Sequence, residues 1–141
     1  MNIEDDVGTD MEPPRATLPG PGETRRISIL GATGSIGTST VAVIEEQPEA
    51  YEVDAVTAFG NAESLARVAK KVRAKVAVIS DRNSYNVLKD ALAGTGIEAA
   101  AGLDAIEDAA SRPVDIVVAG IVGAAGLSPT LAAIRAGSNI A

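Results

Sequence analysis

Three glycines at three-residue spacing constrain the fold more than any other feature of the sequence. Gly31, Gly34 and Gly37 lie where a segment rich in β-branched residues gives way to a helical pattern. In a parallel α/β sheet such glycines allow a sharp turn off the strand, close approach of a pyrophosphate, and close packing of the following helix. The first helical amides then face the phosphates, and Thr33 and Ser35 add hydroxyl donors. The loop therefore predicts a dinucleotide site.

From Arg25 onward, short apolar runs alternate with helical periods. Alternation of this kind indicates a parallel sheet with right-handed crossovers. We expect a Rossmann-like doubly wound parallel sheet with helices on both faces. The expected strands are residues 26–30, 53–58, 76–79, 97–100 and 114–119, and the expected helices are residues 35–46, a helix after Asn61, a helix from Asp81 or Asn83 to Leu92, and residues 103–110.

Several local features of this fold are also predicted. Leu103 and Ile106 share one face of their helix and should both point inward. Ser128, followed by proline, fits the N-cap of the last helix, and Gly137 fits its C′ position. Residues 139–141 resemble the first residues of a further strand, so we expect the sheet to be truncated at the C-terminus.

Charge and composition exclude several function classes. Residues 1–24 hold four of the seven prolines and six acids against one base, and we expect a disordered leader followed by one domain over residues 25–141. The chain has no Cys and no His, which removes thiolate chemistry and the commonest general base. The formal net charge of -7 disfavours a nucleic-acid partner, and the Gly-rich apolar stretch 116–127 is too short for a membrane span. We expect a cytoplasmic protein.

The end of the second predicted strand distinguishes NADP from NAD. An acid at this position usually binds the ribose 2′-hydroxyl of NAD. Residues 57–61 contain no acid, and a carboxylate there would repel a 2′-phosphate. The sequence therefore favours NADPH, with Asn61 as a donor to the phosphate and as the cap of the next helix.

Three segments carry a resemblance to a known family. Residues 119–137 (AGIVGAAGLSPTLAAIRAG), residues 29–37 (ILGATGSIG) with Ser39 and Thr40, and residues 88–92 (LKDAL) closely resemble stretches of 1-deoxy-D-xylulose 5-phosphate reductoisomerases. The resemblance implies an NADPH-dependent oxidoreductase of isoprenoid biosynthesis, which converts this phosphorylated sugar to 2-C-methyl-D-erythritol 4-phosphate. It further implies a divalent metal, Mg²⁺ or Mn²⁺, in the full-length enzyme, and a homodimer.

The resemblance also implies where the cofactor binds. Thr33, Gly34, Ser35 and Ile36 correspond to the pyrophosphate contacts, and the loop 120–126 should lie beside the nicotinamide. One departure is that Gly60 stands where many members have a basic residue, and Arg67 is a candidate substitute for it. The expected cofactor-binding residues are Gly31, Thr33, Gly34, Ser35, Ile36, Gly37, Gly60 and Asn61.

No catalytic or metal-binding residue is assigned, because the family's catalytic stretches do not occur in residues 1–141. We interpret Asp104, Glu107, Asp108 and Asp115 as a solvated helix face and a strand edge, and we expect this chain alone to be inactive. Two alternatives stay open. One is a semialdehyde-dehydrogenase-type NADP oxidoreductase, and the other is a non-catalytic NADP sensor that binds a partner protein.

Overall fold

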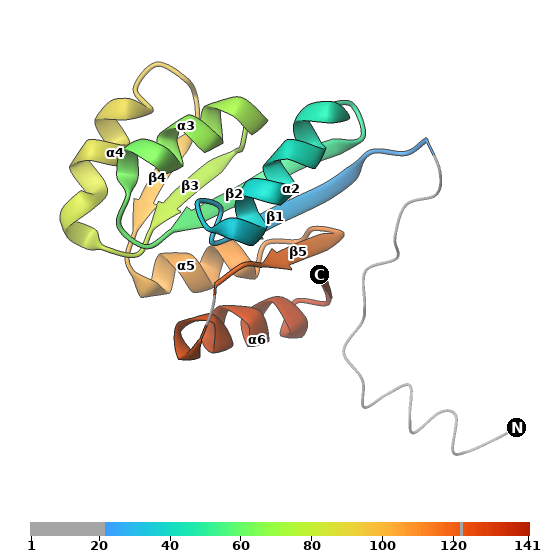
Figure 1. The fold of residues 1–141 in the computed structure, drawn as a ribbon. Helices are drawn as coiled ribbons and strands as arrows, with labels where there is room; N and C mark the ends of the chain where they lie inside the picture. The colour runs from blue at the N-terminus through green and yellow to red at the C-terminus, as the bar shows by residue number, and fades with distance from the viewer. Residues whose placement is uncertain (1–21, 122) are drawn as a thin grey trace, which may run out of the picture.

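Six parallel strands form the central sheet in the computed structural model, which describes residues 22–121 and 123–141. Their order across the sheet is β4-β3-β2-β1-β5-β6, with helices on both sides (Figure 1). The predicted leader falls mostly on residues 1–21, which lie outside the described ranges. In chain order the elements are β1 (Arg25–Leu30), α2 (Ser35–Glu46), β2 (Tyr51–Ala58), α3 (Ala62–Val72), β3 (Val76–Ile79), η1 (Arg82–Ser84), α4 (Tyr85–Ala91), β4 (Glu98–Ala101), α5 (Leu103–Ala110), β5 (Ile116–Ala119), η2 (Ala124–Gly126), α6 (Leu127–Arg135) and β6 (Asn139–Ile140).

Helices cover both faces of this sheet. Helices α2, α3 and α4 contact one another on one face, and α5 contacts α6 on the other (Figure 1). The central strands are therefore shielded from water on both sides, and Ile29, Val56 and Val117 are fully buried. Burying a side chain of this size stabilises the fold by about 1.5–3 kcal/mol. The doubly wound α/β fold predicted from the alternating pattern is confirmed.

The direction of winding reverses at β1. Strands β2, β3 and β4 lie on one side of β1, whereas β5 pairs with its other side and β6 extends beyond β5. Residue Ile27 of β1 pairs with Val53 of β2 and with Ile116 of β5, so these strands run side by side in the middle of the sheet. Since the helices that follow β1 and β5 leave toward opposite faces, a crevice opens between the carboxyl ends of these two strands.

Two of the predicted local features are wrong. Leu103 does not point inward but is 71% exposed, while Ile106 is buried as expected. Leu103 is the first residue of α5 and follows Gly102, whose φ of 103° turns the chain at the end of β4. Its side chain therefore stands at the rim of the sheet rather than over it. Ser128 is not an N-cap, because η2 runs directly into α6 and Gly126 takes that position.

Two other predicted helix ends, Asn61 and Gly137, are confirmed, and a third is confirmed only in part. Asn61 caps α3, with its side-chain Oδ1 accepting a hydrogen bond of 3.1 Å from the amide of Ser64. Asp81 accepts from the amide of Asn83 and so caps the short turn η1, whereas the N-cap of α4 itself is Ser84 and not Asp81 or Asn83. Gly137 follows the C-cap of α6 with a φ of 89°, the left-handed conformation expected at C′.

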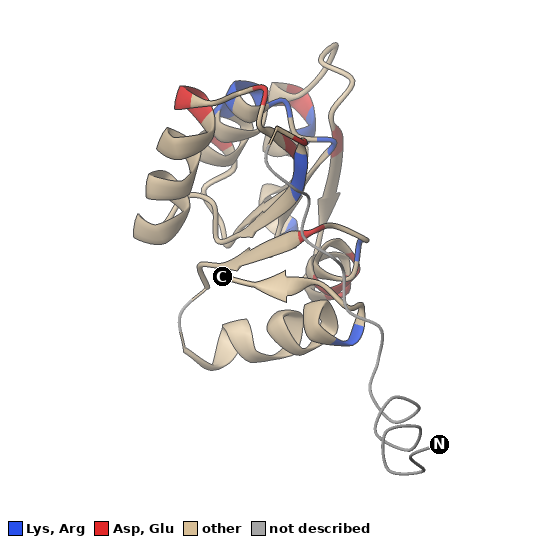
Figure 2. Cartoon of the chain, turned by 90° about the vertical axis from the view of Figure 1, so that its right-hand side faces the viewer, with Lys and Arg blue, Asp and Glu red and all other residues tan. Residues whose placement is uncertain are grey.

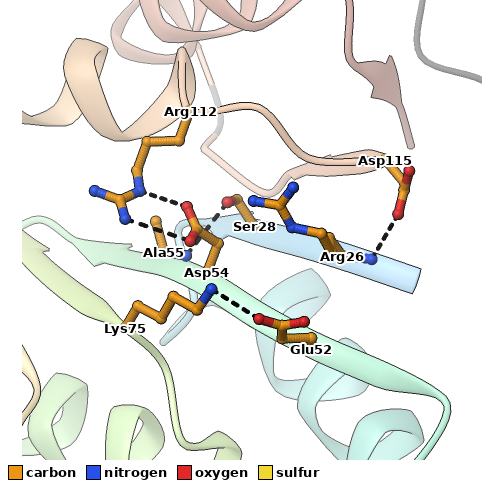
Figure 3. Close-up of polar contacts among 8 residues, drawn as sticks. All are labelled: Arg26, Ser28, Glu52, Asp54, Ala55, Lys75, Arg112 and Asp115. Carbon is orange, nitrogen blue, oxygen red and sulfur yellow. Dashed lines mark hydrogen bonds and ion pairs between the residues drawn. The ribbon is translucent and has the colours of Figure 1, made fainter. Parts of the chain in front are cut away.

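A polar cluster lies at the amino-terminal edge of the sheet (Figure 3). Asp54 of β2 is only 3% exposed and pairs with Arg112, which donates to the carboxylate through Nε and, at 3.4 Å, through Nη2. This hydrogen bond raises the pKa of the Arg112 guanidinium. The ammonium of Lys75 lies 2.7 Å from the carboxylate of Glu52, and that hydrogen bond lowers the pKa of Glu52. Figure 2 views the molecule from the side on which β1 begins and shows that acidic and basic residues from several elements lie on this side.

Candidate dinucleotide-binding site

A cavity of about 500 Å³ occupies the carboxyl ends of the strands, at the point where the winding reverses. Open α/β sheets bind their ligands at this position. The cavity is bordered by loops after β1, β2, β3 and β5 and by the first turns of α5 and α6. Its lining residues are Gly31, Thr33, Gly34, Thr57, Ala58, Phe59, Ser80, Leu103, Ile106, Glu107, Gly120, Ile121, Ala124, Ala125, Ser128 and Pro129.

The three glycines of the first loop are required for different reasons. Gly31 has a φ of 76°, and a Cβ added to it would lie 2.8 Å from the carbonyl atoms of Gly120. A Cβ on Gly37 would lie 2.4 Å from the carbonyl oxygen of Gly31, so only glycine lets α2 approach the strand this closely. A Cβ on Gly34 would meet nothing nearer than 3.6 Å. The fold therefore requires Gly31 and Gly37, whereas Gly34 leaves space that no protein atom fills.

The loop is tied firmly to the neighbouring strand. The amide of Gly31 donates to Oγ1 of Thr57 at 3.0 Å, and the amide of Ala32 donates to the Thr57 carbonyl at 2.7 Å. Thr57 is fully buried, and it is also one of the residues that line the cavity. These bonds fix the direction in which the loop leaves the sheet, so the cavity is formed before any ligand enters.

The first turn of α2 offers backbone donors next to Gly34, although its residues Ser35 and Ile36 line a separate hollow of about 370 Å³ on α2 and not the main cavity. Gly34 is the N-cap and supplies no side-chain oxygen, and the first helical hydrogen bond runs from the amide of Thr38 to the Gly34 carbonyl. The amides of residues 35–37, which precede Thr38, have no hydrogen-bond acceptor within the helix. Thr33, Ser35 and Ile36 are exposed around this turn. Free amides, two hydroxyls and the helix dipole together favour an anionic group.

Thr57, Ala58 and Phe59 at the end of β2 line the main cavity, but the two residues that follow them do not. Gly60 and Asn61 border a separate hollow of about 330 Å³ with Glu63 and Ser84. The Oδ1 atom of Asn61 is used by the helix cap, which leaves its amide nitrogen as the group that can donate outward. Arg67 lies farther along α3, but its Nη2 donates to Oγ of Ser64 at 3.0 Å, so its guanidinium reaches back to the first turn.

The structure adds an acid that reading along β2 did not reveal. A Cβ on Gly60 would lie 4.0 Å from Oδ2 of Asp81, which follows β3. That carboxylate already accepts from the amide of Asn83 and, at 3.4 Å, from the hydroxyl of Ser84. The end of β2 thus has no acid of its own, but two acids lie beside it: Asp81, whose carboxylate accepts hydrogen bonds, and Glu63 in the first turn of α3.

The second glycine-rich loop packs against the first. The amide of Gly120 donates to the carbonyl of Leu30 at 2.8 Å, and a Cβ there would lie 2.7 Å from the same oxygen. Gly126 is buried, and a Cβ on it would lie 2.4 Å from the carbonyl oxygen of Ile121. Residue 122 lies outside the described ranges. The two loops therefore meet through their backbones and form one continuous wall.

Glu107 is placed differently from the sequence-based interpretation, which had it on a solvated helix face. It is half-buried, lines the cavity, and accepts a hydrogen bond from the hydroxyl of Ser128 at the start of α6. Among the described lining residues it alone carries a formal charge. Asp104 and Asp108 of the same helix are exposed, as expected. The pattern of α5 alone could not reveal this contact, since the partner lies 21 residues away.

Neither a cluster of metal-ligating residues nor a membrane-spanning helix occurs in residues 22–121 and 123–141. No group of three or more Asp, Glu, His or Cys residues lies close enough together there to hold a metal ion. No helix in these ranges combines the length and apolar character needed to cross a bilayer. We therefore assign no metal ligand to the described part of this chain.

Known proteins are similar to this chain in sequence and in fold. Residues 27–141 match the family described as 1-deoxy-D-xylulose 5-phosphate reductoisomerase. A relative of that name from Rhodospirillum centenum is 52% identical over 128 residues, which make up 91% of this chain and 32% of the relative. The Zymomonas mobilis reductoisomerase solved in complex with NADPH superposes with a TM-score of 0.82 at 51% identity, covering 84% of this chain and 31% of that one.

A second solved relative adds a different set of ligands. It is a DOX-P reductoisomerase in complex with NADPH, fosmidomycin and magnesium, with a TM-score of 0.77 and 40% identity over 82% of this chain and 29% of that one. The chain thus spans about a third of the length of the relatives that it matches.

Proposed function

The chain belongs to the 1-deoxy-D-xylulose 5-phosphate reductoisomerase family, and we propose that it supplies the NADPH-binding region of such an enzyme. The observation that carries the proposal is the cavity between the two glycine-rich loops, at the carboxyl ends of β1 and β5. The space left beside Gly34 fits a phosphate group, because a Cβ there would meet no protein atom closer than 3.6 Å. The family match also supports the reductoisomerase reading over a semialdehyde dehydrogenase or a separate NADP sensor.

In this proposal the first loop holds the pyrophosphate. The amides of Ser35 and Ile36 and the hydroxyls of Thr33 and Ser35 donate to the phosphate oxygens, and Gly34 gives them access. Thr33 and Gly34 line the main cavity, and Ser35 and Ile36 border the separate hollow at the first turn of α2. Gly31 and Gly37 act indirectly, since their close contacts are with the protein backbone rather than with open space. The site is thus built mainly from backbone donors, whose positions are fixed by the fold.

The second loop lies beside the nicotinamide in the same proposal. When bound, NADPH supplies a hydride for the reduction step. Ile121, Ala124 and Ala125 line the cavity with apolar atoms, which would exclude water from the face of the nicotinamide ring. Glu107 is held by Ser128 at the rim, so its carboxylate does not enter this apolar part freely.

We extend the proposal to the whole enzyme on the strength of the family. The substrate is 1-deoxy-D-xylulose 5-phosphate, the product is 2-C-methyl-D-erythritol 4-phosphate, and a divalent metal takes part. The homodimer implied by the resemblance and the cytoplasmic location expected from the composition belong to the same proposal. Because the chain spans about a third of its relatives, we also propose that it has no turnover by itself.

The preference for NADPH rests on the end of β2. A 2′-phosphate placed there would meet the amide nitrogen of Asn61 and the guanidinium of Arg67. It would also lie near Asp81, whose carboxylate is held by Asn83 and Ser84. Asn61 and Arg67 are the donors that favour the phosphorylated cofactor, and they outweigh Asp81 and Glu63, the two acids near this hollow, in our proposal.

Substituting Asn61→Asp tests this preference without removing the helix cap, because Asp caps α3 as well as Asn does. The added charge should weaken NADPH binding about tenfold, through repulsion of the 2′-phosphate, and leave NADH binding unchanged or stronger. Calorimetric titration of both chains with both cofactors measures the effect. Tighter binding of NADH than NADPH by the unchanged chain would contradict the preference, and binding of neither would contradict the proposed function.

A further inference from the structure

One continuous piece of chain forms the side of the main cavity next to the second glycine-rich loop. The turn η2 runs directly into α6, and this piece supplies four of the residues that line the cavity, namely Ala124, Ala125, Ser128 and Pro129. Because η2 and α6 are continuous, the position of the first turn of α6 also sets the position of Ala124 and Ala125. The distance of that turn from α5 therefore sets the width of the cavity on this side.

Packing fixes the far end of α6 better than its start. Ala133, in the second half of α6, is fully buried in an apolar cluster with Ala110 of α5 and Val117 of β5. In the first turn, by contrast, Leu127 is 62% exposed, and Pro129 is the buried residue. The end of α6 that borders the cavity thus presents its largest side chain to solvent, so a polar contact there has more influence on its position.

The carboxylate of Glu107 supplies such a contact. It accepts a hydrogen bond from the Ser128 hydroxyl, which joins α5 to the first turn of α6 where these two helices lie side by side (Figure 1). Helix α5 is a firm support, because Ile106 and Ala109 of its inner face are buried against the sheet. A carboxylate acceptor also makes this hydrogen bond stronger than one between two neutral groups.

Direct contact with the phosphates of the cofactor does not suit Glu107. NADPH is an anion, and among the described residues that line the cavity Glu107 alone carries a charge. A carboxylate that faced the phosphates would repel them. The hydrogen bond from Ser128 holds the carboxylate toward α6 instead, so Glu107 acts on binding through the position of that helix.

We propose that Glu107 is a positioning residue for the nicotinamide half of the cofactor. By accepting from Ser128 it holds the first turn of α6, and with it Ala124 and Ala125, at the distance from α5 that admits the nicotinamide ring. This inference rests on the proposed function, in which the two alanines lie beside the nicotinamide. The adenosine phosphate lies at the end of β2 in the same proposal, where the Glu107–Ser128 hydrogen bond makes no contact.

Calorimetric titration with NADPH and with 2′,5′-ADP, which lacks the nicotinamide, tests this role. Glu107→Ala should weaken NADPH binding about three- to tenfold and change 2′,5′-ADP binding by less than about twofold, because the lost hydrogen bond affects only the nicotinamide half. The direction is informative, since removing a negative charge would by itself strengthen the binding of an anion. Glu107→Gln should bind NADPH as the unchanged chain does, because its amide oxygen also accepts from a hydroxyl.

Two further substitutions test whether the hydrogen bond is the cause. Ser128→Ala should weaken NADPH binding at least as much as Glu107→Ala, since it removes the same hydrogen bond and releases the carboxylate. The double variant should bind NADPH no more weakly than Ser128→Ala alone, as expected for two residues that act through one contact. Asp108→Ala is the matched control and should leave NADPH binding unchanged, because Asp108 is an exposed acid on the same helix that does not line the cavity.

The outcomes separate this inference from the proposed function. If the unchanged chain binds NADPH and Glu107→Ala binds it as tightly or more tightly, the positioning role is wrong and the proposed function stands. The role is also wrong if Glu107→Ala weakens NADPH and 2′,5′-ADP by the same factor, or if Glu107→Gln binds NADPH as weakly as Glu107→Ala. If the unchanged chain does not bind NADPH, both proposals fail. Circular dichroism of each variant establishes that the fold is retained, which we expect because Glu107 is only half-buried and Ser128 is exposed.

Discussion

Replacing Gly34 by alanine should weaken cofactor binding strongly while leaving the fold intact. The added Cβ would lie 3.6 Å from the carbonyl oxygen of Gly31 and 3.9 Å from that of Gly120, which are ordinary contacts. The φ of Gly34 is -81°, a value that alanine adopts without strain. Alanine is a poorer N-cap than glycine by a few tenths to about 1 kcal/mol, but it reduces the freedom of the unfolded chain by about 0.4–1 kcal/mol. The two effects nearly cancel.

The effect on binding should be much larger. The Cβ would occupy the space through which a phosphate approaches the amides of Ser35 and Ile36. Losing one or two charge-assisted hydrogen bonds costs about 2–4 kcal/mol, which raises the dissociation constant about 30- to 1,000-fold. Gly34→Val, with a larger branched side chain, should have at least the same effect.

Gly37→Ala provides the matched comparison, because its Cβ would lie 2.4 Å from the Gly31 carbonyl oxygen and 2.6 Å from backbone atoms of Ala32. Overpacking against backbone typically costs about 1–3 kcal/mol or more. Urea unfolding followed by circular dichroism and calorimetric titration with NADPH measure the two effects separately. The reasoning is refuted if Gly34→Ala binds NADPH normally, or if it loses as much stability as Gly37→Ala.

Two further predictions concern stability and turnover. Arg112→Ala leaves the carboxylate of Asp54, which is 3% exposed, without its ion-pair partner. The substitution should lower the free energy of unfolding by about 2 kcal/mol, a small loss for a buried ion pair, because Arg112 is partly exposed. A urea midpoint equal to that of the unchanged chain would contradict this. The chain alone, given NADPH, Mn²⁺ and 1-deoxy-D-xylulose 5-phosphate, should show no substrate-dependent loss of NADPH absorbance, with a full-length relative as the positive control. Measurable turnover by residues 1–141 would show that the catalytic groups lie within them.

Local sequence patterns were sufficient for the order of elements and for the first loop. The strands of this sheet are buried on both faces, so their apolar runs are nearly continuous and easily recognised. The three glycines could be located because their spacing reflects the geometry of a single strand-turn-helix unit. Asn61 was identified as a cap for the same reason, since its partner is only three residues away.

The errors have a common physical cause, which is dependence on distant neighbours. Leu103 matched the apolar period of α5, but the sheet ends before it can cover that residue. Glu107 contacts Ser128 on another helix, and Asp81 lies beside Gly60 because β3 pairs with β2. Such contacts follow from how elements are arranged in space, and a helical or strand period carries no information about that arrangement.

The contact between Gly31 and Gly120 has a consequence for tracing the history of such proteins. These residues are 89 positions apart, yet neither can gain a side chain without striking the other segment's backbone. Both are therefore demanded by the architecture, whether or not a nucleotide is ever bound. Gly34 is under no such demand. A related protein that no longer binds the cofactor could change Gly34 and still keep Gly31 and Gly120. The residue at position 34 would therefore indicate loss of cofactor binding better than the residues at positions 31 and 120.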